Sequence, residues 1–289
     1  MPESLRVSAP ASSANLGPGF DCLAVALELR NEVEMVRLEG DELRVVVEGE
    51  GAGEAPTGPD NLFVQAFAVA GGEPRGLEIR MRNRVPFARG LGSSAATIAA
   101  GVVAGLAWAG EEDDPLRLTA ELEGHPDNAA AAVRGGLTLA WKTPAGPRAL
   151  RLGRCPVEFV AVVPPDELST EQARAALPPQ VAHYDAVYTV GRAALLVAAL
   201  GAGRLDLVGD ALDDRLLEPF RAPLVPLLAE VRARILDLPA LGATLSGAGP
   251  TVLVWCEPGS GAAVAASLSD LAGARAGVLE VASAGARLE

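Results

Sequence analysis

The chain contains almost no lysine. Of its 24 basic residues only Lys142 is a lysine, and the others are arginines. A pyridoxal Schiff base requires a lysine amine, and a Walker-type phosphate clamp requires a lysine beside a glycine-rich loop. Lys142 follows the strand-like run TLAW, with no glycine-rich loop directly before it. We therefore exclude both kinds of site.

Cysteine, aromatic residues and long apolar runs are scarce as well. Aromatic residues make up 4% of the chain, and the three cysteines form no CxxC pair, so neither disulfide bonds nor a zinc site is expected. No run of eighteen apolar residues occurs, so no membrane partner is expected. The first residues lack a basic segment followed by an apolar one, which predicts a cytoplasmic location. The cysteines are Cys22, Cys155 and Cys256.

Positive charge is outweighed by negative charge. The net charge of −13 and the pI near 4.7 predict repulsion of a phosphate backbone, so nucleic acid is not expected as a partner. Apolar material is abundant, because hydrophobic residues make up 49% of the 289 residues. This length and composition predict a soluble globular chain, folded as one large domain or as two closely packed ones.

Strand-like and helix-like patterns both occur in each half of the sequence. Helices that lie outside the strand runs favour an α+β fold. Strands are expected at 5–9, 28–38, 43–47, 136–141 and 157–163, around a turn within 243–255, and close to the end of the chain. Helices are expected at 61–70, 93–108, 115–123, 170–176, 182–200 and 224–236, with a short one before the last strand.

The segment PFARGLGSSAA at 86–96 runs directly into an expected helix of small residues. Its glycines allow a ligand to approach the backbone, and Ser93 and Ser94 lie where the helix begins. A helix start presents unpaired N–H groups and the positive end of the helix dipole, so this segment suits phosphate. An ordinary glycine turn with a serine cap is the alternative.

Three further segments collect polar residues in turns. Two carboxylates, an imidazole, a third carboxylate and an amide fall within eight residues of ELEGHPDN, where glycine and proline predict a turn. The alternative is a helix that ends at Gly124, followed by a second helix whose cap residue is Asp127 or Asn128. The loops SSANLGPGFD at 12–21 and LSGAGPT at 245–251 each lie between strand-like runs. Alone, each of these two loops indicates only a turn.

Together, in this order and spacing, the four segments resemble the motifs of the GHMP kinases, a superfamily that includes galactokinase, homoserine kinase and mevalonate kinase. The similarity is greatest to the homoserine kinase family, extends over about 240 residues, and rests most specifically on EGHPDN. It implies a fold of two α+β domains with the active site in the cleft between them. We place the ATP-binding domain at 1–155 and the second domain at 156–289.

The resemblance also implies a set of site residues for ATP and Mg²⁺. Asn61 resembles the asparagine on the adenine side. Ser94 would hold Mg²⁺ together with a glutamate before the HPDN box, either Glu123, which we prefer, or Glu121. The residues expected around ATP are Pro86, Phe87, Ala88, Arg89, Gly90, Leu91, Gly92, Ser93, Ser94, Ala95, Ala96 and Asn61.

For the acceptor, the resemblance implies L-homoserine, with Asp127 and Asn128 as the catalytic residues. Two arginines on one carboxylate are physically reasonable, because the guanidinium fork matches it. Asp127 either removes the proton or orients the hydroxyl, and an ordinary carboxylate is a weak base for an alcohol. A homodimer is an open expectation. The substrate residues expected are Asn15, Asp21, His125, Thr170, Arg174, Arg221 and Gly247.

Three alternatives stay open. A kinase for mevalonate or shikimate would share the ATP half of the site but not the two arginines. A nucleotide-binding regulator would lack turnover, and the presence of Ser94, Glu123 and Asp127 argues against it. A hydrolase using Ser94 and His125 is the weakest alternative, because no GxSxG motif occurs.

Overall fold

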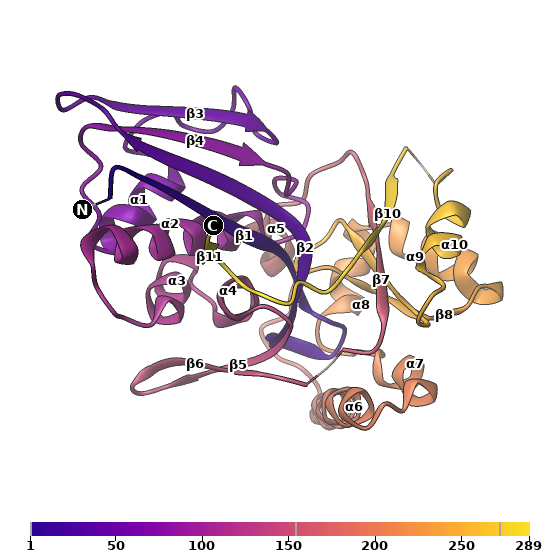
Figure 1. Ribbon diagram of the computed structural model, residues 1–289. Coiled ribbons are helices and arrows are strands. Elements are labelled where there is room, and N and C mark those ends of the chain that lie inside the picture. Colours follow the sequence, from indigo (N-terminus) through magenta and orange to yellow (C-terminus); the bar gives the residue numbers. More distant parts are fainter. Residues whose placement is uncertain (1, 154, 272) are drawn as a thin grey trace.

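The computed structural model describes residues 2–153, 155–271 and 273–289 (Figure 1), and its strands form two sheets. The strands are β1 (Ser4–Asn15), β2 (Gly19–Arg37), β3 (Leu43–Gly49), β4 (Leu77–Asn83), β5 (Leu137–Thr143), β6 (Gly146–Arg151), β7 (Glu158–Val163), β8 (Ala240–Leu245), β9 (Val252–Cys256), β10 (Arg275–Leu279) and β11 (Arg287–Leu288). The seven-stranded sheet has the order β11-β1-β2-β4-β3, with β5 attached to β2 and β6 to β5. The four-stranded sheet has the order β10-β7-β9-β8.

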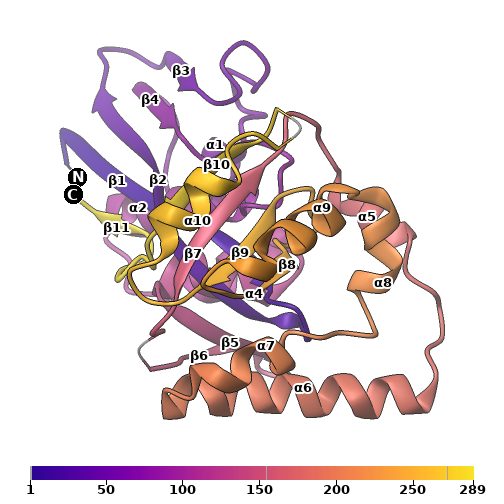
Figure 2. The ribbon, with the colours of Figure 1, turned by 90° about the vertical axis from the view of Figure 1, so that its right-hand side faces the viewer.

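Helices cover one face of the large sheet and flank the small one (Figures 1 and 2). The helices are α1 (Leu62–Val69), α2 (Ser93–Ala109), α3 (Pro115–Glu123), α4 (Pro126–Arg134), α5 (Thr170–Ala175), α6 (His183–Ala202), α7 (Val208–Ala211), α8 (Glu218–Arg221), α9 (Leu227–Arg234) and α10 (Gly261–Ser267), with short 3₁₀ turns at 205–207, 222–224 and 235–237. The first four lie against the large sheet. The mixed α+β architecture expected from the sequence is therefore confirmed.

Helices α1 and α2 pack closely because α2 carries glycine where α1 crosses it. A Cβ atom at Gly101 would lie 2.6 Å from the backbone oxygen of Phe63, and one at Gly105 would collide with the backbone oxygen of Phe67. The phenyl rings of Phe63 and Phe67 then continue a buried cluster that reaches Trp108 at the end of α2. This packing fixes α2, whose first turn forms one wall of the site described below.

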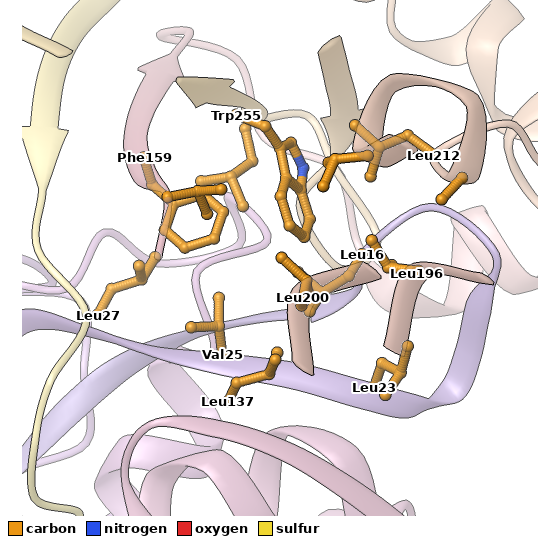
Figure 3. Close-up of a cluster of buried hydrophobic side chains, with 14 of the residues drawn as sticks. Leu16, Leu23, Val25, Leu27, Leu137, Phe159, Leu196, Leu200, Leu212 and Trp255 are labelled. Atoms are coloured by element: carbon orange, nitrogen blue, oxygen red, sulfur yellow. The ribbon is translucent and has the colours of Figure 1, made fainter. Parts of the chain in front are cut away.

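The largest apolar cluster joins the two halves of the molecule (Figure 3). Phe159 on β7 and Trp255 on β9 make an edge-to-face contact with ring centroids 4.9 Å apart. Leucines and valines of β2 and β5 pack on the same cluster from the large-sheet side, including Val25 and Leu137. This core is shared by the two halves, and Leu91 belongs both to it and to the wall of the cleft described below.

The end of the chain returns to the large sheet. Segment 280–289 leaves the small sheet, and β11 pairs antiparallel with β1, with Val7 opposite Leu288. The guanidinium of Arg30 on β2 donates to the backbone oxygens of Ala284 and Gly285. The strands of the small sheet thus fall within 158–279. The division at residues 155 and 156 stays a prediction.

Helix α6 stands out for its composition. It is 20 residues long, and its 18-residue window has a mean hydropathy of 1.3, so by length and composition alone it could cross a membrane. In the structure 22% of that window is buried. The helix packs one side on the shared core through Leu196 and Leu200, as a helix of a globular protein does.

Candidate active site

A cleft of about 300 Å³ lies between the two halves and brings the four sequence segments together. Its walls come from the β1–β2 loop, the start of α2, the α3–α4 turn, helices α5 and α8, and the β8–β9 turn. It is lined by Ala14, Asn15, Asp21, Pro86, Ala88, Arg89, Gly90, Leu91, Gly92, Ser93, Ser94, Glu123, His125, Asp127, Asn128, Leu168, Ser169, Thr170, Arg174, Arg221, Gly247 and Ala248.

The glycine loop before α2 is held in a conformation that side chains resist. Gly90 and Gly92 have φ values of 73° and 67°, and Gly92 caps α2. A Cβ atom at Gly92 would collide with the Ser12 hydroxyl, and one at Gly90 would collide with the backbone oxygen of Ser246. The loop therefore lies flat against its neighbours. The unpaired N–H groups at the start of the 17-residue helix α2 border the cleft.

Ser94 and Glu123 meet at one edge of the cleft. The Ser94 hydroxyl donates a 2.8 Å hydrogen bond to the carboxylate of Glu123, the last residue of α3. Burial raises the pKa of Glu123, and the bond from Ser94 opposes that rise. Glu121 points elsewhere, since its carboxylate is exposed and lies 3.6 Å from the Arg117 guanidinium. Of the two glutamates, Glu123 is the one that faces the cleft.

The turn between α3 and α4 aims His125, Asp127 and Asn128 into the cleft. Gly124 ends α3 with a φ of 88°, and α4 begins at Pro126 with His125 as its cap residue. The Asp127 carboxylate is 2% exposed, lies 3.2 Å from Nδ1 of His125 and accepts the Asn128 backbone N–H. The hydrogen bond to Asp127 raises the pKa of His125 against the opposing effect of burial.

Asn15 and Asp21 occupy the left-handed region, where non-glycine residues are uncommon. Their φ values are 70° and 55°. Asn15 Nδ2 donates to the backbone oxygen of Gly247 at 2.8 Å, and its Oδ1 accepts the Asp21 N–H at 3.1 Å. These bonds hold the Asp21 carboxylate at the cleft, where it accepts hydrogen bonds of 2.8 and 3.3 Å from the Arg174 guanidinium.

Arg221 is a buried cation, and among the residues that the structure describes no carboxylate forms an ion pair with it. It is 2% exposed and donates to the backbone oxygens of Ala173 and Gly247 at 3.2 and 3.0 Å. Burial, helped by the nearby charge of Arg174, lowers its pKa to about 10. The guanidinium carbons of Arg174 and Arg221 each lie 5.8 Å from the centre of the Phe20 ring. The cleft thus presents two guanidinium groups on one aromatic ring.

A second cavity of about 320 Å³ adjoins the first at Ala88, Ser93 and Ser94. Phe87, Leu62, Met81 and the asparagines Asn61 and Asn83 contribute to its wall. Asn61 caps α1, since its Oδ1 accepts the Phe63 N–H and its Nδ2 donates to the Pro56 carbonyl. Asn83 is 3% exposed, and its buried Oδ1 has no hydrogen-bond partner.

Comparison with known proteins identifies the family. The sequence matches the model of the GHMP kinases N terminal domain over residues 61–136 and that of the GHMP kinases C terminal over residues 196–273. It is 42% identical to a homoserine kinase of Prochlorococcus marinus over 92% of this chain and 88% of that one, and 44% identical to one of Streptomyces avermitilis over 91% and 88%. The chain belongs to the homoserine kinase family of the GHMP kinases.

The structure of the homoserine kinase from Cytophaga hutchinsonii superposes on all of this chain and 98% of that chain, with a TM-score of 0.88 and 28% sequence identity. The family and the two-domain GHMP kinase fold expected from the sequence are thereby confirmed. Among the described residues, no group of three or more His, Cys, Asp or Glu side chains could hold a metal ion.

Most residues expected from the homoserine kinase motifs meet in the cleft. Four lie outside it: Phe87 and Asn61 line the adjoining cavity, whereas Ala95 and Ala96 are fully buried in the helix packing. The Ala96 N–H already donates to the Gly92 carbonyl. Thr170 lies exposed at the rim. The roles of these residues remain predictions.

Sequence reasoning missed three side chains that shape this homoserine kinase-like site. The Ser12 hydroxyl donates to Asn128 Oδ1 at 2.8 Å, and the Ser246 hydroxyl donates to the Gly90 carbonyl at 2.7 Å. The third is Phe20, under the two arginines. All three stand inside segments that the sequence had singled out, but nothing local tells that they bind residues more than a hundred positions away.

Proposed function

We propose that the protein transfers the γ-phosphoryl group of ATP to the side-chain hydroxyl of L-homoserine, giving O-phospho-L-homoserine and ADP. One observation carries the proposal: the cleft combines a helix start behind a glycine loop with paired positive and negative side chains. The first suits a phosphate chain, and the second suits an acceptor that carries both an ammonium and a carboxylate. Relatives named homoserine kinase support it. A cytoplasmic location is part of the proposal.

The charged groups of the acceptor would replace the partners in an existing ion pair. Arg174 and Asp21 are paired across the cleft, each about 40% exposed, at a distance of 2.8 Å. A zwitterion brings a carboxylate for Arg174 and Arg221 and an ammonium for Asp21, so no charge is left alone. An acceptor with one charge would strand one member of the pair. This arrangement favours an amino acid over a plain alcohol.

Asp127 and Asn128 would orient the acceptor hydroxyl towards the phosphoryl group. Both stand on the first turn of α4, and the hydrogen bonds from His125 and Ser12 limit their rotation. Phosphoryl transfer has a loose transition state in which positioning and charge stabilisation matter most. Asp127 therefore needs only to hold the acceptor hydroxyl in line with the phosphoryl group. The proton can leave the hydroxyl as the new O–P bond draws electron density from its oxygen and makes it more acidic.

Ser94 and Glu123 fit a magnesium ion that is shared with phosphate. Magnesium prefers oxygen ligands and in kinases is commonly bound by one or two protein groups together with substrate phosphates. A hydroxyl and a carboxylate 2.8 Å apart, beside the helix start, provide that donor set. When bound, the ion supplies positive charge to the phosphoryl oxygens. The first-turn N–H groups of α2 provide further positive potential from the protein itself.

Measuring ADP release with MgATP and a panel of alcohols tests the proposal. We expect turnover to depend on L-homoserine and to be much slower with mevalonate or shikimate. Preference for an acceptor without an amino group would overturn the choice of substrate and leave the kinase activity standing. ATP consumption that is independent of every acceptor would instead point to a nucleotide-binding regulator.

A further inference from the structure

Asp214 is a buried carboxylate that the proposed mechanism does not use. It lies between α7 and α8 and is 4% exposed. Burial of a carboxylate is costly unless hydrogen bonds satisfy its oxygens. Its Oδ1 accepts the backbone N–H of Leu216 at 2.9 Å, and its Oδ2 accepts those of Leu217 and Glu218 at 2.7 and 2.8 Å. Asp214 therefore satisfies three consecutive N–H groups at the start of α8.

Helix α8 depends on these bonds because it is a single turn. It has four residues, and the side chain of Leu217, the residue before it, makes no capping hydrogen bond. Within the turn the N–H groups of Phe220 and Arg221 share one acceptor, the Leu217 carbonyl, at 3.2 and 3.3 Å. A helix this short is unstable by itself, because its first turn fixes several residues for few hydrogen bonds. The Asp214 carboxylate therefore contributes strongly to the path that the turn takes.

Arg221 is the last residue of α8, so the path of the turn decides where its guanidinium lies. Arg221 lines the cleft and donates to the carbonyl of Ala173 on α5, which lies beside α8 (Figure 2). It also donates to the Gly247 carbonyl, which accepts a second hydrogen bond from Asn15 Nδ2. Burial lowers the pKa of Arg221 to about 10, and the charge of Asp214 is among those that oppose this change. Asp214 is thus linked to Arg221 through the turn and through its charge.

The orientation of the Asp214 carboxylate is fixed from α6. Thr189 is 2% exposed, and its hydroxyl donates to Asp214 Oδ1 at 3.3 Å and accepts the Arg215 N–H at 3.1 Å. Neither Thr189 nor Asp214 is among the described residues that line the cleft. Any effect of these two residues on the acceptor must therefore pass through α8.

A second buried carboxylate keeps α8 attached to the small sheet. Glu218, which is 4% exposed, accepts the Leu245 backbone N–H of β8 at 2.7 Å and a hydrogen bond from Arg232. Neither of these bonds involves Asp214. Loss of the Asp214 carboxylate should therefore change the path of α8 and leave the turn attached to β8.

We propose that Asp214 is a positioning residue for the acceptor, because it holds α8 in the orientation that presents the Arg221 guanidinium to the acceptor's carboxylate. The inference rests on the proposed function, in which that carboxylate lies between Arg174 and Arg221. Asp214 would act through Arg221 and not on the reacting atoms. Its contribution should therefore depend on whether the acceptor carries a carboxylate, whereas a general weakening of the fold would affect every acceptor and ATP alike.

Steady-state kinetics of Asp214→Ala with two acceptors test the inference. KM for homoserine should rise about five- to thirty-fold, because the apparent affinity falls with the fraction of chains in which the uncapped α8 keeps its orientation. By contrast, kcat/KM for 3-aminopropanol, which has no carboxylate, and KM for MgATP should each change by less than about twofold. The matched control is Asp213→Ala, at an exposed carboxylate that accepts the Tyr188 hydroxyl, and it should leave all these values unchanged.

Substitutions of Thr189 test the same link without removing the carboxylate, in case Asp214→Ala does not fold. Thr189→Val removes the hydroxyl that bonds to Asp214 and keeps the shape of the side chain, whereas Thr189→Ser keeps the hydroxyl. We expect KM for homoserine to rise about threefold with valine, as loss of one hydrogen bond predicts, and to stay at the wild-type value with serine. Asp214→Asn keeps one carbonyl acceptor for the turn and should fall between wild type and Asp214→Ala.

The ratio of the wild-type kcat/KM values for the two acceptors separates failure of the inference from failure of the proposed function. If wild type prefers homoserine strongly, then equal losses with both acceptors in Asp214→Ala, or an unchanged KM for homoserine, would overturn the role of Asp214 alone. Equal KM values for homoserine in Thr189→Val and Thr189→Ser would also count against it. If wild type uses both acceptors equally well, the carboxylate clamp itself is wrong, and the inference falls with it.

Discussion

An acceptor without its carboxylate should be a far poorer substrate than homoserine, and 3-aminopropanol is that acceptor. It keeps the hydroxyl and the ammonium and lacks only the group expected between Arg174 and Arg221. Changing the acceptor is a cleaner perturbation than changing Arg221, because the buried Arg221 also donates to the backbone of Ala173 and Gly247. The loss then reports the site and not the stability of the fold.

The electrostatics of Arg221 set the magnitude. Burial lowers its pKa from 12.5 to about 10, so the charged guanidinium is destabilised by about 3 kcal/mol at roughly 1.4 kcal/mol for each unit of pKa. A carboxylate beside it relieves much of that destabilisation, and an uncharged acceptor relieves none. At about 1.4 kcal/mol per decade, kcat/KM should fall about a hundred-fold. Removal of one partner of a buried charge pair typically costs about 2–5 kcal/mol, which brackets this figure.

The variant Arg174→Ala should affect the kcat/KM values of the two acceptors differently. With homoserine, kcat/KM should fall because one carboxylate contact is lost. With 3-aminopropanol, kcat/KM should stay level or rise, because Asp21 no longer has Arg174 as a competing partner for the ammonium. Arg204→Ala, which removes an exposed arginine paired with Asp206, is the control and should affect neither acceptor.

The assay is coupled ADP release at saturating MgATP, with each acceptor varied for the wild type and both variants. Equal damage to the two acceptors by Arg174→Ala would refute the carboxylate assignment. So would a wild-type enzyme that uses 3-aminopropanol as well as homoserine. In either case the kinase activity itself would still stand.

Three other outcomes follow from the site. Ser94→Ala and Glu123→Gln should each lower kcat at least a hundred-fold with little change in melting temperature. Glu121→Gln, at an exposed carboxylate, should keep turnover. The reverse result for the two glutamates would show that Glu121, and not Glu123, is the metal ligand. Asp127 raises the pKa of His125, so the stabilisation from this pair is present below the ordinary histidine pKa of about 6.5 and is lost as pH rises through the raised value. The difference in unfolding free energy between wild type and His125→Gln should therefore be larger at about pH 5.5 than at about pH 9. A difference that does not depend on pH would contradict the pairing. Replacing all three cysteines by alanine should leave turnover intact, because burial raises the pKa of each thiol, to about 11 in Cys155 and about 12 in Cys256. Loss of activity in a variant that stays folded would reveal a nucleophile. Those cysteines are Cys22, Cys155 and Cys256.

The sequence predicted the motif segments well because their chemistry is local. The glycines of GLGSS, the helix start at Ser93 and the turn at Gly124 depend on neighbouring residues, and the structure has all of them. The cap residue of α4 was not predicted correctly. The sequence offered Asp127 or Asn128, whereas the structure has His125 as the cap and Pro126 at the first helical position.

Strand boundaries were less predictable where burial hides the pattern. β2 begins at Gly19, nine residues before the expected start at 28, because residues 23–27 are buried on both faces and show no alternation. Strand β4 was missed although Leu77, Ile79 and Met81 alternate with outward side chains. Strand β6 was missed as well, since none of its residues is buried and no apolar face marks it.

The partners of site residues could not be predicted, because they are far apart in sequence. Nothing near Asn83 shows that its carbonyl oxygen will be buried without a partner beside the second cavity. Nothing near Asp21 shows that Arg174, 153 positions later, will be its partner. These contacts depend on how the two sheets dock, which the shared apolar core decides.

Strand β11 gives the order of biosynthesis a structural meaning. A ribosome delivers β1 among the first residues and its outer neighbour β11 at positions 287–288, so the edge of β1 stays open throughout translation of the intervening chain. Segment 280–289 also supplies the backbone oxygens that the buried guanidinium of Arg30 needs. A nascent chain in which every residue of the cleft has been synthesised therefore still lacks one edge strand of its large sheet. Synthesis of β11, and not completion of the motifs, is therefore the point at which the large sheet can be completed, and a chain that still lacks β11 offers the exposed edge of β1 to chaperones and proteases.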